Sequence, residues 1–226
     1  MISEEYYLVV NMLFKPQERT IIDEKDGLNN TVKINTIEGK KAIFQREVEE
    51  WLLKPMEKLL DEDIVELRNG YNNKPFTNAI FVLFGLFVYI EKMELYRGNG
   101  TPNDRGSTQR LVDGVKRIFN NLSLYPDKGI KHILERSRHN LMHQAMIGDD
   151  ILLNYGFGHN DFEHAIDIIG EGKNQEIRIN PKKMYDKIYD DFTGYLTLID
   201  DDEDIKDKFI IFFDTVYKDE IELIRS

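Results

Sequence analysis

Apolar side chains recur every three to four residues along most of the chain, which is the spacing that gives a helix one buried face. This pattern predicts helices over residues 41–60, 76–96 and 111–119. The second of these stretches is apolar nearly all round, which is typical of the central helix of a bundle. Its phenylalanine stripe is expected to lie in the core: Phe81, Phe84 and Phe87.

The pattern departs from helical spacing in two regions. Within residues 1–40 only residues 31–37 alternate like a short strand, and the rest of this N-terminal segment is assigned to no element. Residues 151–179 contain three short apolar runs separated by glycines, which predicts a small β-strand insertion. Pro55 interrupts the first helical stretch, so it either kinks that helix or opens a second one.

Two capping signals predict the helices that complete the chain. Asn180 followed by Pro181 is a good start for a helix, and a final helix is expected after the acidic residues 200–204. The sequence therefore predicts a mainly α fold, formed by a single domain over residues 1–226, with the strand insertion at about residues 151–179.

Composition narrows the classes of function. The chain has no cysteine, which excludes disulfides, thiolate metal sites and thiol nucleophiles. Its longest apolar run, residues 79–90, is shorter than the ~20 residues that a bilayer span requires, and the start lacks the basic region of a secretory signal. We therefore expect a cytoplasmic protein with no membrane partner.

The distribution of charge points to one region. The formal net charge of the whole chain is -11, which repels nucleic acid, so a nucleic-acid partner requires a local basic patch. Residues 97–147 carry nine Lys and Arg against four Asp and Glu, a net of +5, which leaves -16 on the rest of the chain. This is the only strongly basic segment of the chain.

The basic segment ends in a helix with an unusual polar face. Pro126 and Gly148 bracket this helix, whose predicted core face includes Ile130 and Leu134. The opposite face carries three of the five histidines together with two methionines, which predicts a partly buried surface whose groups titrate near neutrality. These residues are His132, His139, Met142, His143 and Met146.

Arg138 on this helix is followed by two polar residues and, after four intervening positions, by His143. This run resembles the R-x4-H motif of the HEPN superfamily (higher eukaryotes and prokaryotes nucleotide-binding). The resemblance implies a HEPN-like helical bundle that acts as a homodimeric, metal-independent endoribonuclease, with a composite site formed by the motif helices of both protomers. It implies that Arg138 and His143 are catalytic and that His139 and Asn140 support them. Arg136 also fits the permitted spacing, so the identity of the motif arginine stays open.

The residue types suit RNA cleavage by the ribose 2′-hydroxyl. This reaction needs a base, an acid and positive charge against the phosphorane. Imidazole transfers protons near pH 7, and a guanidinium fork matches two phosphate oxygens. His139 and His143 also form an i, i+4 pair, but no metalloprotease pattern accompanies it, so neither a metal nor a cofactor is expected.

The expected partners are RNA and a second copy of the chain, and the toxin or anti-phage setting that the resemblance implies adds an antitoxin or nucleotidyltransferase partner. The alternative is a catalytically inactive HEPN-like protein that binds a partner protein or nucleotide through the same face. His159 and His164 lie in a glycine-rich turn and are expected to be surface residues.

Overall fold

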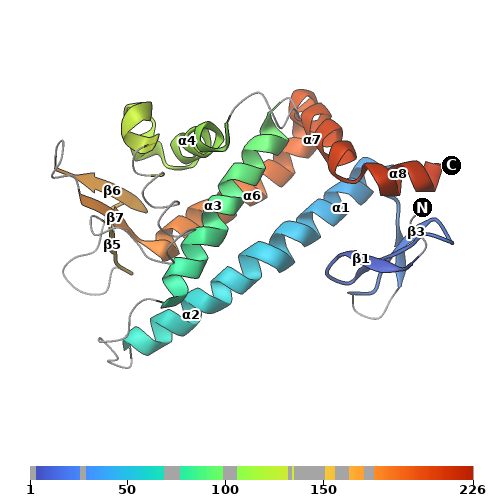
Figure 1. Cartoon of the computed structure of the whole chain (residues 1–226), viewed down its shortest axis with the longest axis horizontal. Helices are drawn as coiled ribbons and strands as arrows, with labels where there is room; N and C mark the ends of the chain where they lie inside the picture. Colours follow the sequence, from blue (N-terminus) through green and yellow to red (C-terminus); the bar gives the residue numbers. More distant parts are fainter. Residues whose placement is uncertain are drawn as a thin grey trace. The chain divides into compact units, whose positions relative to one another are not determined.

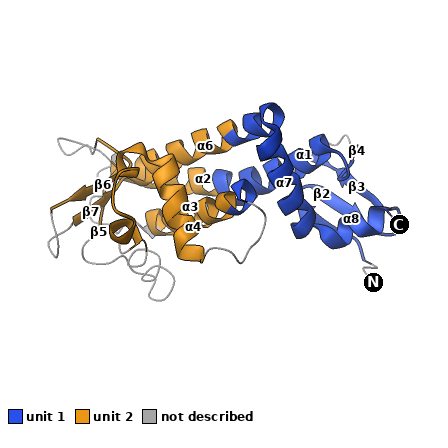
Figure 2. Ribbon diagram, turned by 90° about the horizontal axis from the view of Figure 1, so that it is seen from above, with its two compact units in different colours: residues 1–54, 95–101, 195–226 blue, residues 55–94, 102–194 orange. Residues whose placement is uncertain are grey.

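The computed structural model is mainly helical, with two small sheets (Figure 1). It divides into two compact units, to both of which α3 and α6 contribute residues (Figure 2). Unit 1 comprises residues 1–54, 95–101 and 195–226, and unit 2 comprises residues 55–94 and 102–194. The structure describes residues 4–25, 29–68, 77–98, 106–131, 134, 151–155, 163–170 and 176–225. None of the helices in these ranges combines the length and the apolar content that a bilayer span requires.

Unit 1 begins with a four-stranded antiparallel sheet in which each strand pairs with the next, where the sequence predicted only one strand. Its strands are β1 (Tyr6–Val9), β2 (Met12–Lys15), β3 (Thr20–Asp23) and β4 (Asn30–Val32). The predicted strand over residues 31–37 is wrong in its second half, because β4 ends at Val32. Thr36 instead caps the next helix, where its Oγ1 accepts a hydrogen bond from the Gly39 N–H at 3.1 Å.

This helix, α1 (Ile37–Val48), is followed directly by a π-helical turn, η2 (Glu49–Leu53), and by α2 (Lys54–Arg68). The Lys54 N–H donates to the carbonyl of Glu49, five residues earlier, which is the wide spacing of a π-turn. Pro55 follows at once. A proline has no N–H, and its ring collides with the carbonyl four residues before it in a regular helix. The wide turn therefore coincides with the position where the proline needs space.

An aromatic cluster forms the core of unit 1. The ring centroids of Phe44 and Tyr96 lie 4.5 Å apart, and the Tyr195 hydroxyl donates to the Tyr96 carbonyl at 3.2 Å. Phe209 on α7 (Glu203–Val216) stacks on Tyr96 at 5.7 Å. One final helix was predicted, whereas the structure has a second, α8 (Lys218–Arg225). The Tyr6 hydroxyl donates to Glu220 on α8 at 2.6 Å, so the two ends of the chain lie side by side (Figure 1).

The start of α1 passes close to the preceding backbone at Gly39, so a side chain at this position requires the backbone to move. An alanine Cβ at this position would lie 1.9 Å from the Lys33 carbonyl oxygen, whereas a Cβ at Gly194 in the exposed part of α6 meets nothing within 4 Å. We expect Gly39→Ala to lower the free energy of unfolding by about 1–3 kcal/mol or more, because the backbone must move. Gly194→Ala should raise it by about 0.5–1 kcal/mol. Urea denaturation measures both changes, and a gain in stability from Gly39→Ala would contradict the close approach.

Unit 2 is built around α3 (Thr77–Arg97), whose bounds nearly match the predicted helix over residues 76–96. The expectation that its phenylalanine stripe lies in the core is wrong for two of three positions, since Phe81 and Phe84 are 62% and 40% exposed while Phe87 is buried. Where a helix is apolar nearly all round, its sequence does not reveal which face its neighbours cover.

Three helices pack on the other faces of α3 within unit 2. Met56 of α2 approaches Gly85, and α4 (Ser107–Ile118) approaches through Gly114, close to Ile90. The third neighbour is α6 (Pro181–Asp201), on which Asp191 accepts a hydrogen bond from the Tyr89 hydroxyl at 3.1 Å. A short 3-10 turn, η3 (Asn120–Leu122), follows α4.

The second sheet confirms the predicted strand insertion at residues 151–179. It consists of β5 (Ile151–Leu153), β6 (Ile166–Ile169) and β7 (Glu176–Ile179), in the order β5-β7-β6. The next residue, Asn180, begins α6 as predicted, because its Oδ1 accepts a hydrogen bond from the Lys183 N–H at 3.0 Å.

A buried carboxylate ties this region to the helices of unit 2. Asp63 on α2 accepts hydrogen bonds from the Tyr155 hydroxyl at 2.6 Å and from the Ala79 N–H at 3.1 Å. The Asp63 carboxylate therefore satisfies a backbone donor in the first turn of α3. It also binds Tyr155, which lies two residues after the end of β5. Burial raises the pKa of this carboxyl.

Candidate functional site

The five site residues that the sequence predicted lie outside the described residues of the structure: Arg136, Arg138, His139, Asn140 and His143. The start of their predicted helix is described. Residues 127–131 are helical, and Ile130 and Leu134 are each 2% exposed. Both residues belong to the predicted core face, so the helical phase assigned from the sequence holds at this end of the segment.

A half-buried ion cluster connects three helices of unit 2. Arg117 on α4 donates through Nε to Glu94 on α3 at 2.8 Å, and through Nη1 to Asp191 on α6. The Tyr89 hydroxyl donates to the second oxygen of Asp191. Burial opposes the charge of the guanidinium, but Asp191 and Glu94 outweigh this effect and raise the pKa of Arg117. The cluster fixes α3, α4 and α6 to one another.

Ion pairs in and around this cluster reduce the positive charge that the basic segment, residues 97–147, offers a ligand. Arg117 is neutralised by its two carboxylates, Arg110 pairs with Glu91 at 3.3 Å, and Lys116 pairs with Asp127. Arg110 and Arg117 pair with carboxylates outside residues 97–147, so they join helices of unit 2 and contribute little field for an incoming phosphate. The net of +5 over residues 97–147 therefore overstates the positive charge that this segment offers a ligand.

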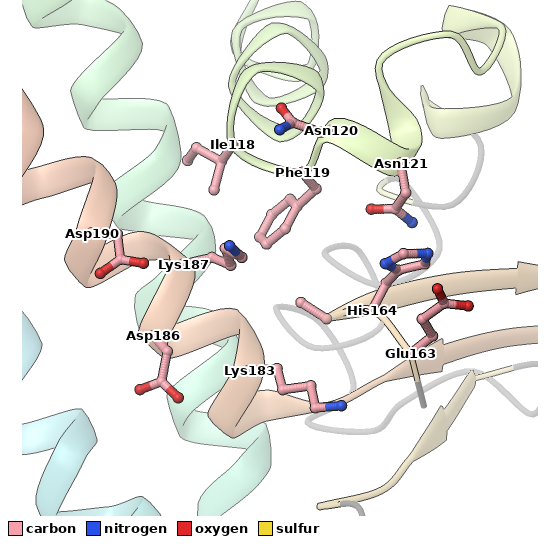
Figure 3. A pocket seen from close by; sticks show the side chains of 11 residues that line it. Ile118, Phe119, Asn120, Asn121, Glu163, His164, Lys183, Asp186, Lys187 and Asp190 are labelled. Atoms are coloured by element: carbon pink, nitrogen blue, oxygen red, sulfur yellow. The ribbon is translucent and has the colours of Figure 1, made fainter. Parts of the chain in front are cut away.

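A pocket of about 380 Å³ opens in unit 2 next to this cluster (Figure 3). Its size lies within the range of small-molecule sites. Three segments form its walls: the end of α4 with η3, the residues immediately before β6, and the first turns of α6. The lining residues are Ile118, Phe119, Asn120, Asn121, Glu163, His164, Ala165, Lys183, Asp186, Lys187 and Asp190.

Two hydrogen bonds hold the walls of the pocket together. The Asn121 side-chain amide on η3 donates to the Ile166 carbonyl in β6 at 2.7 Å. The Asn180 N–H, at the start of α6, donates to the Ala165 carbonyl at 2.9 Å. Since Arg117 joins α4 to α6, each wall is tied to the other two. The pocket is therefore part of the folded framework of unit 2.

The floor of the pocket is apolar, and the side chains of one lysine and one histidine face its interior. Phe119 and Ala165 are buried, at 3% and 6% exposed. Figure 3 shows Lys187 and His164 on opposite sides, both directed toward the interior, whereas Asp186 and Asp190 point away from it. Asp186 is paired with Lys182 at 2.5 Å.

Within the described part of the chain, neither the Lys187 ammonium nor the His164 imidazole has a hydrogen-bond or ion-pair partner. The backbone N–H of His164 donates to Asp167 at 3.4 Å. His164, expected to be an ordinary surface residue, is half-buried in the pocket wall. A polar side chain that is half-buried beside an apolar floor without a protein partner is available to a ligand.

The sequence did not reveal this pocket, because its residues come from segments that pair over long separations, such as Asn121 and Ile166. The one local signal is the polar face of α6, where Lys183, Asp186, Lys187 and Asp190 follow helical spacing. An ordinary solvated helix has the same pattern.

Comparison of the chain with protein-family models, curated proteins and solved structures found no match. The resemblance to the HEPN superfamily therefore rests on the motif run and the helical architecture. Among the described residues, no three His, Asp or Glu side chains form a group that could hold a metal ion.

Proposed function

We propose that the protein is a HEPN-like, metal-independent endoribonuclease that cleaves RNA by attack of the ribose 2′-hydroxyl at a composite site in a homodimer, in a toxin or anti-phage setting. The observation that carries this proposal is the run Arg-His-Asn-Leu-Met-His at residues 138–143. Arg138 stabilises the phosphorane and His143 transfers protons, while His139 and Asn140 orient the site. Arg136 remains the second candidate for the motif arginine.

Three features of the structure support the proposal. The chain is mainly helical, as the resemblance requires. The burial of Ile130 and Leu134 agrees with the helical phase from which the sequence predicts His139 and His143 on the opposite face. Lys128 and Lys131 are exposed in the same short described stretch. Lys128 provides positive charge near the motif in sequence, in place of the arginines that the carboxylates of unit 2 neutralise.

The mechanism predicts the chemistry of the cleavage products. The purified full chain should cut single-stranded RNA in the presence of EDTA and leave 5′-hydroxyl ends, because the 2′-oxygen displaces the 5′-oxygen of the next nucleotide. These ends are detected by labelling with a polynucleotide kinase without prior phosphatase treatment. The matched control is the same oligonucleotide with 2′-deoxy nucleotides, which should stay intact.

Three results would contradict the nuclease proposal: cleavage that requires a divalent metal, cleavage of the deoxy substrate, or a monomeric mass for the active protein in solution. Failure to cut any RNA while still binding it would favour the alternative, a catalytically inactive HEPN-like binding protein.

A further inference from the structure

The pocket of unit 2 has the chemistry of a site for a small phosphorylated ligand. We propose that it binds a phosphate ester of a hydroxyl-bearing group, such as a sugar phosphate, with the phosphate between Lys187 and His164. This inference does not depend on the proposed ribonuclease activity, because the lining residues within the described part of the chain lie outside the motif helix.

The cationic groups favour a phosphate over a neutral ligand. His164 faces Lys187 across the pocket (Figure 3). Ammonium and imidazole N–H groups form charge-assisted hydrogen bonds to phosphate oxygens, and Lys187 has no partner in the described part of the chain that would compete.

The remaining wall residues favour a phosphate that carries an organic group. The volume of about 380 Å³ exceeds what inorganic phosphate fills, and the floor of Ile118, Phe119 and Ala165 offers an apolar surface for the carbon face of a sugar. The Asn120 amide and the Glu163 carboxylate are exposed on the rim, where they can hydrogen-bond to hydroxyl groups.

The two acidic residues of α6 do not cancel this preference. Asp186 is held by Lys182, and Asp186 and Asp190 both point away from the interior (Figure 3). The pocket is also formed in advance by the hydrogen bonds from Asn121 and Asn180. A preformed site loses little conformational entropy on binding, which favours affinity for a small ligand.

The proposal is tested by calorimetric titration of the full chain with ribose 5-phosphate. Lys187→Ala should weaken binding by about tenfold or more, which is the loss expected for one charge-assisted hydrogen bond. The matched control is Lys208→Ala, which removes a lysine from an exposed pair with Asp204 on α7 and should change the affinity by less than about twofold. Lys187 is exposed on its helix, so its loss should leave the far-ultraviolet circular dichroism unchanged.

Two results would overturn the proposal: no binding of ribose 5-phosphate at millimolar concentration, or equal affinity of wild type and the Lys187→Ala variant. A titration with a 5′-phosphorylated RNA oligonucleotide then distinguishes the source of the phosphate. If Lys187→Ala weakens the oligonucleotide and ribose 5-phosphate alike, the ligand is a strand of RNA. If only ribose 5-phosphate is affected, the ligand is a free metabolite.

Discussion

Replacement of His143 by alanine is expected to lower the rate of RNA cleavage by about 10²- to 10⁴-fold, the contribution of one positioned proton-transfer group. An alanine neither accepts the 2′-hydroxyl proton nor donates one to the leaving 5′-oxygen. The measurement is a single-turnover cleavage rate in EDTA with protein in excess over RNA, which separates the chemical step from product release.

The matched control for this experiment is His132→Ala, because His132 belongs to the same predicted helix and to the same histidine-rich face but lies outside the motif. Its cleavage rate should stay within a few-fold of wild type. Equal cleavage rates for the His143→Ala and wild-type proteins would contradict the proposal that the motif is a nuclease site.

The same assay decides between the two candidate arginines. Loss of the motif guanidinium should slow cleavage strongly, whereas loss of the other should have a small effect. Substitution by lysine at the motif position should restore only part of the rate, because an ammonium keeps the charge but cannot bind two phosphate oxygens in a planar fork. Parallel alanine and lysine variants at Arg136 and Arg138 therefore identify the functional residue.

Local signals in the sequence predicted the elements that depend on neighbouring residues. Asn180 caps α6 through its own side chain, and the strands β5 to β7 fall within the three apolar runs separated by glycines. The phase of the helix that begins at residue 127 also followed from spacing alone, as Ile130 and Leu134 are both buried. In each case the physical cause lies within a few residues of the effect.

The elements that the sequence missed depend on distant partners. Residues 31–37 alternate like a strand, but most of them do not form one. Ile34 is buried although it lies in a turn, and Thr36 is the N-cap of α1. Phe81 and Phe84 are apolar at helical spacing, yet no neighbouring helix within the described residues covers them. The four-stranded sheet forms through pairings between strands, and the alternation within each short strand was too brief to identify it.

Charge shows the same limit at the candidate site. The count over residues 97–147 suggested a basic surface, but Arg110 and Arg117 are paired with carboxylates on helices remote in sequence. The pocket was missed for the same reason, since Asn121 and Ile166 meet only in the folded chain. Net charge along a segment predicts a binding surface only where the charges stay free of internal partners.

Arg117→Met is expected to lower the free energy of unfolding by about 1–3 kcal/mol, because it removes the cation that Glu94 and Asp191 share in a half-buried site. The side chains of these two residues are only 16% and 11% exposed, so water replaces the lost guanidinium poorly. Methionine keeps most of the apolar volume of arginine, which restricts the change to the charge and its hydrogen bonds. Urea denaturation followed by circular dichroism measures the effect.

Lys116→Met on the same helix is the matched control, because Lys116 pairs with an Asp127 carboxylate that is 57% exposed, and such pairs contribute about 0–1 kcal/mol.

Adding Asp191→Asn to Arg117→Met should recover part of the lost stability, since the neutral amide removes one stranded charge and can still accept a hydrogen bond from Tyr89. Equal losses for Arg117→Met and Lys116→Met would show that the cluster is solvated. Additive losses in the double variant would assign the effect to packing. Recovery instead shows that the loss comes from the Asp191 carboxylate, which Arg117 neutralises where α4 meets α6 beside the pocket.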